Sequence, residues 1–314
     1  MMAVPQNPPN PSSSGQPSGS SAGTSLKHRY DEVRQRIAKA AARAGADPRG
    51  VLLVAVTKYA DPEQIRELIQ LGHSDFGENR VQQLLQRHAM IDEWLSRHRT
   101  MPSSPWSGAG ASEQLDLFTA PAKIDATELA PAPVVRWHMI GTLQRNKVKK
   151  VAEVCRLIHS VDSLRLAEEI QAIAVKRETP IDVLLQVNTS GERSKGGCAP
   201  AAAIHLAEQF DTMLNVRLRG VMTMAPYSDN PEDSRDSFVR AREIYEEIRE
   251  AQIGGGHCTI LSMGMSNDFE VAIEEGANLV RVGSALFGER PVDAGADENE
   301  ENEPDSDEDA EPTP

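Results

Sequence analysis

Apolar residues recur with two different spacings along residues 25–288 of this chain. Short runs rich in Val, Leu and Ile between turn residues predict strands, and apolar positions three or four apart predict amphipathic helices. The first run, Val51–Val56, is apolar throughout and lies between the turn residues Asp47–Gly50 and Asp61–Pro62. Such a run is typical of a parallel strand that is buried on both faces. Lys58 follows it where the strand should end.

Strands and helices are expected to alternate eight times. The predicted strands are 51–56, 75–79, 134–140, 157–161, 181–187, 218–224, 259–263 and 279–282, and the predicted helices are 25–44, 61–71, 80–98, 143–154, 163–175, 201–210, 231–253 and 269–275. Strict alternation implies a parallel sheet. Eight units over roughly 240 residues match a (β/α)8 TIM-type barrel. A doubly wound open sheet is the alternative, but no GxGxxG follows the first strand to favour it.

Three segments interrupt this pattern. Residues 1–24 are mostly Pro, Ser, Gly and Asn, residues 100–133 have no clear periodicity, and residues 289–314 are acidic. Such compositions cannot bury enough apolar surface to offset the entropy of ordering. We therefore expect a disordered tail at 1–24, a barrel domain at 25–288 with a disordered insertion at 100–133, and an acidic disordered tail at 289–314. The insertion follows a helix and precedes a strand, which places it away from the C-terminal ends of the strands.

Charge and cysteine content narrow the class of protein. The formal net charge is −14, but eleven acidic residues and no basic ones lie in 293–314, so the rest carries only −3. A nucleic-acid partner would need a basic face, and none is indicated. The three cysteines match no metal-site spacing and favour a reducing compartment. No apolar run approaches the roughly 18 residues of a membrane span. We expect a cytoplasmic protein without membrane or metal.

Candidate site residues, most of them polar, lie at the ends of the predicted strands. They are Lys58, Glu78 with Asn79, His138 with Gly141, Asp162, Asn188–Gly191, Met224 with the Ala-Pro that follows, Ser262–Ser266, and Arg281 with Gly283 and Ser284. Each of these alone is more often structural: a lysine can close a strand, and an aspartate can cap a helix. In a barrel, however, the C-terminal ends of the strands meet at one face, where ligands bind. Together these groups predict a ligand site.

Two of these stretches indicate phosphate. Ser262, Met263 and Ser266 lie before a helix, where hydroxyl and backbone N–H groups can converge on an anion. The small residues Gly283 and Ser284 follow the last strand, and barrels often bind phosphate after strands seven and eight. A lysine across the mouth from a phosphate site suggests pyridoxal 5′-phosphate, whose aldehyde condenses with an amine.

Arg281 limits the chemistry of such a site. A guanidinium only donates hydrogen bonds, so a pyridine nitrogen facing it would stay unprotonated. The ring would then be a weak electron sink. This favours a racemase-like site, or a protein that holds the cofactor and does little chemistry with it.

The motifs in order closely resemble those of the pyridoxal phosphate homeostasis proteins (the YggS/PROSC family). The stretches that carry the resemblance are Val54–Lys58, Phe76–Asn79, Trp137–Gly141, Leu143–Lys147, Ile158–Asp162, Gln186–Gly191, Lys195–Gly197, Leu218–Met224, Leu261–Asp268 and Val280–Ser284. The resemblance covers about Ser25 to Gly288. The 100–133 insertion and both tails are not features of the family, and Ser284 stands where the family commonly has Thr.

The resemblance implies one barrel of the alanine racemase N-terminal type with pyridoxal phosphate bound as a Schiff base on Lys58. Arg281 is expected near the pyridine ring. Ser262, Gly283 and Ser284 are expected around the phosphate, and Asn79 and His138 would line the pocket. Met263 and Ser266, in the same stretch as Ser262, are also expected to bind the cofactor.

The resemblance also implies a carrier that buffers and delivers the cofactor, without strong turnover and without catalytic residues. Apo-enzymes that depend on pyridoxal phosphate are candidate recipients, and the protein is expected to be a monomer or weak dimer. Nothing globular follows Gly288 to supply a second acid/base group. One alternative is a weak pyridoxal phosphate-dependent amino-acid racemase that uses Lys58 and Tyr227. Another is a protein-binding barrel in which the lysine is structural.

Overall fold

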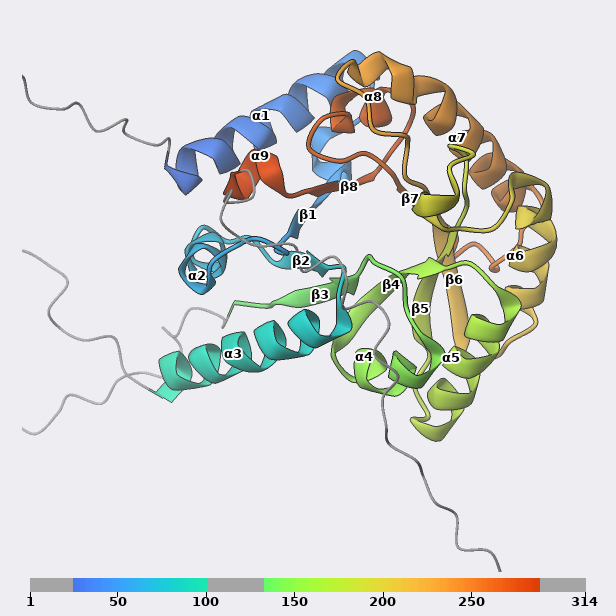
Figure 1. The fold of residues 1–314 in the computed structure, drawn as a ribbon, viewed down its shortest axis with the longest axis horizontal. Helices are drawn as coiled ribbons and strands as arrows, with labels where there is room; N and C mark the ends of the chain where they lie inside the picture. Colours follow the sequence, from blue (N-terminus) through green and yellow to red (C-terminus); the bar gives the residue numbers. More distant parts are fainter. Residues whose placement is uncertain (1–24, 101–132, 289–314) are drawn as a thin grey trace, which may run out of the picture.

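Eight parallel strands close into a barrel in the part of the chain that the computed structural model describes, residues 25–100 and 133–288 (Figure 1). In barrel order they are β1 (Leu52–Val56), β2 (Asp75–Glu78), β3 (Arg136–Met139), β4 (Cys155–Val161), β5 (Ile181–Gln186), β6 (Val216–Met222), β7 (Ile260–Ser262) and β8 (Leu279–Val282). The barrel closes because β1 pairs with β8, with Ala55 opposite Val282. This pairing confirms the predicted fold and excludes the open sheet.

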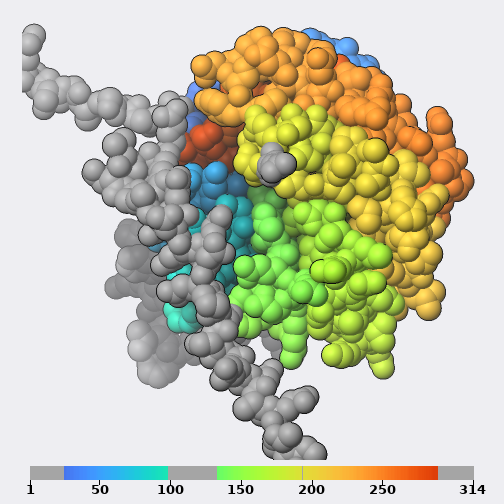
Figure 2. Space-filling view, turned by 45° about the vertical axis from the view of Figure 1, so that its right-hand side comes forward, coloured from blue at the N-terminus to red at the C-terminus, as the bar shows by residue number. Residues whose placement is uncertain are grey.

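The α-helices surround the strands (Figure 1). They are α1 (Leu26–Arg43), α2 (Pro62–Gln70), α3 (Val81–Thr100), α4 (Val148–Val154), α5 (Leu164–Lys176), α6 (Ala203–Asp211), α7 (Arg235–Glu250), α8 (Phe269–Glu274) and α9 (Ser284–Phe287). Short 3-10 turns are η1 (Pro48–Gly50), η2 (Arg145–Lys147), η3 (Arg193–Lys195), η4 (Pro200–Ala202) and η5 (Pro231–Ser234). Figure 2 shows green, yellow and orange segments following one another over the surface in chain order.

Some element boundaries differ from the predicted ones. Strand β6 begins at Val216, two residues before the predicted start at residue 218. The prediction began too late because Arg217 and Arg219 interrupt the apolar run. Both arginines pair with Asp182 of β5, at 3.3 and 3.7 Å. The predicted helix 143–154 is divided into η2 and α4. Helix α9 was not predicted, because its four residues are too few to show a helical period.

The two predicted tails, 1–24 and 289–314, lie outside the described residues. Residues 101–132 of the predicted insertion also lie outside them. The chain enters that insertion at the end of α3 and leaves it before β3. Both points are at the opposite face of the barrel from the C-terminal ends of the strands.

Two apolar layers support the barrel. A small cluster fills part of the barrel interior and consists of Val54, Leu157, Leu184, Met222 and Leu279. A larger cluster packs the outward strand positions against the helices, and its fully buried members include Phe76, Phe210, Phe238 and Phe269. Side chains alternate between these two layers along each strand. Polar side chains at inward positions therefore lie inside the barrel, next to the small cluster.

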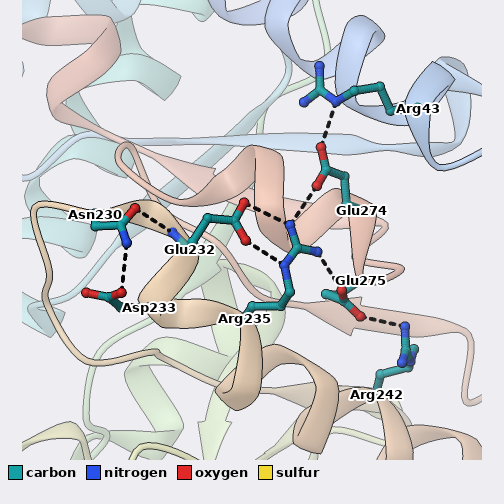
Figure 3. Close-up of polar contacts among 8 residues, drawn as sticks. All are labelled: Arg43, Asn230, Glu232, Asp233, Arg235, Arg242, Glu274 and Glu275. Carbon is teal, nitrogen blue, oxygen red and sulfur yellow. Dashed lines mark hydrogen bonds and ion pairs between the residues drawn. The ribbon is translucent and has the colours of Figure 1, made fainter.

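Helix α1 lies beside α8 and α9, and so covers the seam between the first and last strands (Figure 1). Arg36 of α1 makes two hydrogen bonds to Glu270 of α8, at 2.8 and 3.2 Å. A larger ion-pair network is centred on Arg235, whose guanidinium contacts Glu232, Glu274 and Glu275 (Figure 3). Residues from both ends of the domain therefore hold the ring of helices together.

Candidate functional site

Lys58 lies in the turn that follows β1, and its side chain is exposed. Its nitrogen lies 4.9 Å from the centre of the Tyr59 ring. Strand β1 lies between β2 and β8, so the turn is flanked by the ends of both strands. Asn79 follows β2 and is also exposed, while Gly283 follows β8. The structure thus brings Lys58, Asn79 and Gly283 to the same mouth of the barrel.

A buried ion pair holds the Lys58 turn from both sides. Glu78 is fully buried, and its Oε1 accepts a hydrogen bond from the Thr57 hydroxyl and lies 2.9 Å from Arg87 Nε. Arg87 Nη1 also donates to the carbonyl of Ala60 at 3.0 Å. Burial raises the pKa of Glu78, although Arg87 opposes this. Residues 57 and 60 are therefore tied to one Glu–Arg pair, with Lys58 between them.

Ser266 lies where the loop after β7 meets the end of β8. Its hydroxyl oxygen accepts the backbone N–H groups of Gly283 at 3.1 Å and Ala285 at 3.3 Å. A hydroxyl accepts two hydrogen bonds and donates one, so its proton is left to donate elsewhere. Ser284 is exposed at the first position of α9. Met263 is fully buried, and its N–H donates to the carbonyl of Leu279.

Gly283 lets the end of β8 lie against β1. A Cβ atom built on it would lie 3.3 Å from the carbonyl oxygen of Val56 and 3.4 Å from the Val56 Cβ. Gly141 has a similar role after β3, because a Cβ there would lie 2.1 Å from the carbonyl oxygen of Asn79. Because neither residue has a side chain, the loops of neighbouring strands can lie close together at the mouth.

Arg281 is an inward residue of β8 and is 3% exposed. Its Nη1 donates to the hydroxyl oxygen of Ser262 at 2.6 Å, and its Nη2 donates to the carbonyl of Thr223 at 2.8 Å. Burial lowers its pKa to about 10, which leaves it protonated at neutral pH. Arg281 is therefore a buried cation whose observed hydrogen bonds go to neutral groups.

A row of side chains continues inward from Ser262. The Ser262 hydroxyl lies 3.1 Å from Nδ1 of His159, and His159 Nε2 lies 3.0 Å from Nδ1 of His138. His138 Nε2 in turn lies 3.1 Å from Oδ1 of Asp75. His138 was predicted to line the pocket. In the structure it is 2% exposed, and both of its ring nitrogens are engaged within this row.

The predicted residues thus form two groups. Lys58, Asn79, Ser266, Gly283 and Ser284 lie at the rim. His138, Ser262 and Arg281 lie inside the barrel, and Met263 connects the two groups along the chain.

Sequence reasoning did not assign Asp75, His159, Thr223 or Arg87 to the site. A signal for the first two was present. Residues two apart on a strand share a face. Asp75 therefore lies on the same face of β2 as Gly77, and His159 lies on the same face of β4 as Leu157. Polar residues at inward strand positions can be read from that alternation, but their partners cannot.

The described ranges give two further negative findings. No helix in residues 25–100 or 133–288 combines the length and hydrophobicity that a membrane span requires. No group of three or more His, Cys, Asp or Glu side chains in these ranges could hold a metal ion.

The fold and a family comparison define the class of protein. The family model described as "Alanine racemase, N-terminal domain" matches residues 24–291. A solved alanine racemase of Clostridium difficile has the same fold, with a TM-score of 0.56 at 14% identity over 85% of this chain and 57% of its own. This chain is therefore a barrel of the alanine racemase N-terminal type.

Closer relatives specify the family. A pyridoxal phosphate homeostasis protein of Aquifex aeolicus is 40% identical over 263 residues, which cover 83% of this chain and 97% of the relative. One of Pseudomonas aeruginosa is 36% identical over 84% of this chain and 96% of its own. A solved structure of PipY from Synechococcus elongatus, with pyridoxal phosphate bound, is 31% identical, with a TM-score of 0.59 over 82% of this chain and all of its own. The chain belongs to the pyridoxal phosphate homeostasis protein family.

Proposed function

We propose that this protein binds pyridoxal 5′-phosphate at the C-terminal mouth of its barrel, covalently through Lys58, and buffers and delivers the cofactor. The observation that carries the proposal is Arg281, a buried cation on the strand next to the one that ends at Lys58. A neutral pyridine nitrogen is an acceptor of the kind that a donor-only guanidinium requires. The binding of this cofactor by PipY supports the same reading.

The donor set at the rim suits the rest of the cofactor. Ser266 has a hydroxyl proton left to donate, and it lies beside the half-buried backbone of Gly283 and the exposed hydroxyl of Ser284. Hydroxyl and backbone N–H donors are the groups that bind phosphate at barrel mouths. Lys58, in the turn after the neighbouring strand β1, is exposed and therefore accessible to an aldehyde.

Each predicted residue then has a role in binding. Lys58 would supply the amine for a Schiff base with the aldehyde. The hydroxyls of Ser266 and Ser284 would hold the phosphate, Gly283 would let the backbone approach it, and Arg281 would donate to the ring nitrogen. Asn79 would face the ring from β2. Ser262 and His138 would act through Arg281, because their side chains are hydrogen-bonded within the row that leads to it, and Met263 would act through the loop.

When bound, the cofactor supplies an electrophilic aldehyde and a ring that can accept electrons. Arg281, as a donor, would keep the ring nitrogen of a bound cofactor unprotonated, so that the ring would withdraw electrons weakly. The racemase alternative needs a second acid/base group opposite Lys58. Tyr227 is 78% exposed, and its hydroxyl contacts Asp229 at 3.5 Å, so no observation favours it in that role. We therefore infer a carrier without strong turnover.

The visible absorbance of the protein, before and after borohydride, tests the covalent link. We expect the full-length chain, incubated with pyridoxal phosphate, to show a Schiff-base band that reduction fixes onto Lys58, as mapped by peptide mass spectrometry. Lys58→Ala should lose the band and the adduct. Lys176→Ala, which changes an exposed lysine at the end of α5, should retain both. A reduced adduct distributed over several lysines, and unchanged in Lys58→Ala, would contradict the proposal.

A racemisation assay separates the carrier from the enzyme. Alanine and serine racemisation by the loaded protein should not exceed that by free pyridoxal phosphate. Turnover well above that of free cofactor, lost in Lys58→Ala, would instead establish a racemase.

A further inference from the structure

Four hydrogen bonds join the side chains of five strands in one row inside the barrel. Arg281 of β8 contacts Ser262 of β7, which contacts His159 of β4, which contacts His138 of β3, which contacts Asp75 of β2. All five residues are at most 3% exposed. The row therefore runs through a region without bulk water, where each polar group needs a partner.

Hydrogen-bonding capacities fix the direction of most of the row. Arg281 can only donate, so the Ser262 oxygen accepts from it. Burial holds the pKa of His159 well below its ordinary value, so this ring is neutral, with one donor and one acceptor nitrogen. Burial raises the pKa of Asp75, but hydrogen bonds from Arg136 and His138 outweigh it and lower the pKa, so its carboxylate is ionised and accepts from His138 Nε2.

Only one arrangement then satisfies every group. With His138 neutral, its Nδ1 accepts from His159 Nε2, and His159 Nδ1 accepts the Ser262 proton. All four bonds point the same way, from the cation of Arg281 to the anion of Asp75. In the reverse arrangement, His138 is doubly protonated and His159 donates to Ser262. The Ser262 proton then has no acceptor within the row.

We propose that His138 and His159 are positioning residues that couple the charge of Arg281 to the carboxylate of Asp75, and so orient the guanidinium toward the ring nitrogen of the cofactor. This inference rests on the proposed function for its ligand, but the row itself does not. Hydrogen bonds in a chain polarise one another, and those of ionised groups are the stronger ones. In the described part of the chain, no ion pair of Arg281 itself is observed. The buried carboxylate of Asp268 acts on Arg281 electrostatically without a hydrogen bond to it, and the row adds a hydrogen-bonded link to a second carboxylate, Asp75.

The far end of the row is anchored near solvent. Arg136, whose side chain is 40% exposed, makes two hydrogen bonds to Asp75, at 2.8 and 2.6 Å. A substitution at Asp75 should therefore act on a cofactor that it does not touch.

Nitrogen NMR of the histidine rings in the full-length, cofactor-free protein tests the row directly. We expect both His138 and His159 to be neutral and to carry the proton on Nε2. Assignment uses the His138→Gln and His159→Gln variants, each of which removes one set of ring signals. A proton on Nδ1 of His159, or a doubly protonated His138 at neutral pH, would overturn the inference.

Ligand binding tests the coupling to the ring nitrogen. The affinities of wild type and variants are measured for pyridoxal phosphate and for the analogue in which carbon replaces the ring nitrogen. His159→Leu breaks the row, and we expect it to weaken pyridoxal phosphate binding about tenfold, or about 1.4 kcal/mol. The analogue should bind both proteins within about twofold of each other, because it lacks the acceptor that Arg281 serves. His159→Gln keeps one donor and one acceptor and should recover most of the loss.

A second pair of variants distinguishes a loss of coupling from a loss of folding. Asp75→Asn keeps an acceptor for His138 but removes the charge, and it should weaken binding of pyridoxal phosphate and not of the analogue. Asp182→Asn is the matched control, because Asp182 is also nearly buried beside arginines but lies outside the row. Equal losses for both ligands would mean a structural role only and would overturn the coupling. A wild type that binds neither ligand would overturn both the proposed function and this coupling, whatever the NMR result.

Discussion

Gly264 shows how one residue sets the loop between β7 and α8. Its φ is +92°, and a Cβ built on it would lie 2.6 Å from the Ala272 Cβ and 2.8 Å from the Phe269 Cα. Its carbonyl also accepts the N–H of Arg281 at 3.0 Å. The loop that carries Met263 and Ser266 can therefore pack on α8 only if residue 264 has no side chain.

We predict that Gly264→Ala lowers the free energy of unfolding by about 3 kcal/mol, because it adds a clash to an unfavourable backbone conformation. Gly276→Ala is a matched control, with φ of +94° and only Arg242 Cδ within 4 Å, at 3.7 Å. It should cost about 1 kcal/mol. Urea unfolding of both variants measures the difference, and equal costs would show that the clash is relieved by movement of the loop.

His73 gives the protein a sensitivity to acid. It is 7% exposed; its Nε2 lies 2.8 Å from the carbonyl of Asp75, and the Tyr30 hydroxyl lies 3.4 Å from its Nδ1. Burial lowers its pKa from 6.5 to about 4. As pH falls below 6.5, His73 therefore becomes protonated in the unfolded chain while it stays neutral in the folded chain. The stability that neutral His73 contributes is present above 6.5 and is lost as pH falls toward 4.

We predict that this residue accounts for about 2 kcal/mol of the stability lost between pH 7 and pH 5. In His73→Gln, which can still donate to the Asp75 carbonyl, the fall in unfolding free energy over this range should be smaller by that amount. Urea unfolding at both pH values provides the comparison. Parallel pH profiles for wild type and variant would rule out His73 as the titrating group.

At the scale of elements, α3 positions the end of β1. Arg87 of α3 holds both Glu78 at the end of β2 and the Ala60 carbonyl beyond Lys58. Its side chain is 16% exposed, and that of Glu78 is fully buried. Removing one member of a buried ion pair leaves the other charge uncompensated, which usually costs more than the pair itself contributes.

We predict that Arg87→Leu lowers the unfolding free energy by about 3 kcal/mol and that adding Glu78→Gln restores much of the loss. In both variants the Lys58 turn would lose the contact between Arg87 and the Ala60 carbonyl. Adduct formation between pyridoxal phosphate and Lys58 should therefore be slower in the double variant, despite its recovered stability. Arg97→Leu on the same helix alters an exposed pair with Glu93 and should cost under about 0.5 kcal/mol. A double variant no more stable than Arg87→Leu would contradict this account.

At the scale of the whole molecule, closure depends on contacts between the ends of the domain. Arg235 is the first residue of α7 and contacts Glu232, Glu274 and Glu275. Glu274 also pairs with Arg43 of α1 at 2.6 Å (Figure 3). Hydrogen bonds to these carboxylates raise the pKa of Arg235 and lower those of Glu232 and Glu274. One guanidinium thus joins η5, α7, α8 and, through Glu274, α1.

We predict that Arg235→Met lowers the unfolding free energy by about 1–2 kcal/mol, because a network is worth more than isolated surface pairs. Arg240→Met on the same helix breaks one exposed pair, with Glu243, and should cost under about 0.5 kcal/mol. The gap between the two should narrow in 1 M salt, which screens exposed charges. An effect of Arg235→Met that is no larger than that of Arg240→Met would mean that the network adds nothing to closure.

The sequence by itself determined the order and kind of the elements and the place of the rim residues. Apolar runs such as Val51–Val56 and the helical stripes between them are local patterns, and eight alternating units leave few arrangements other than a barrel. Because parallel strands end at one face, Lys58, Asn79, Ser266 and Gly283 could be expected to meet there without any knowledge of their contacts.

Only the tertiary structure decided what lies inside the barrel. The row from Asp75 through His138 and His159 to Ser262 and Arg281 crosses from β4 to β7, between residues 103 positions apart in the chain. No local period encodes that contact, because it depends on the stagger and closure of the strands. For the same reason His138 could be recognised as a site residue from sequence, while its orientation within the row could not. Burial and hydrogen-bond direction are properties of the closed barrel.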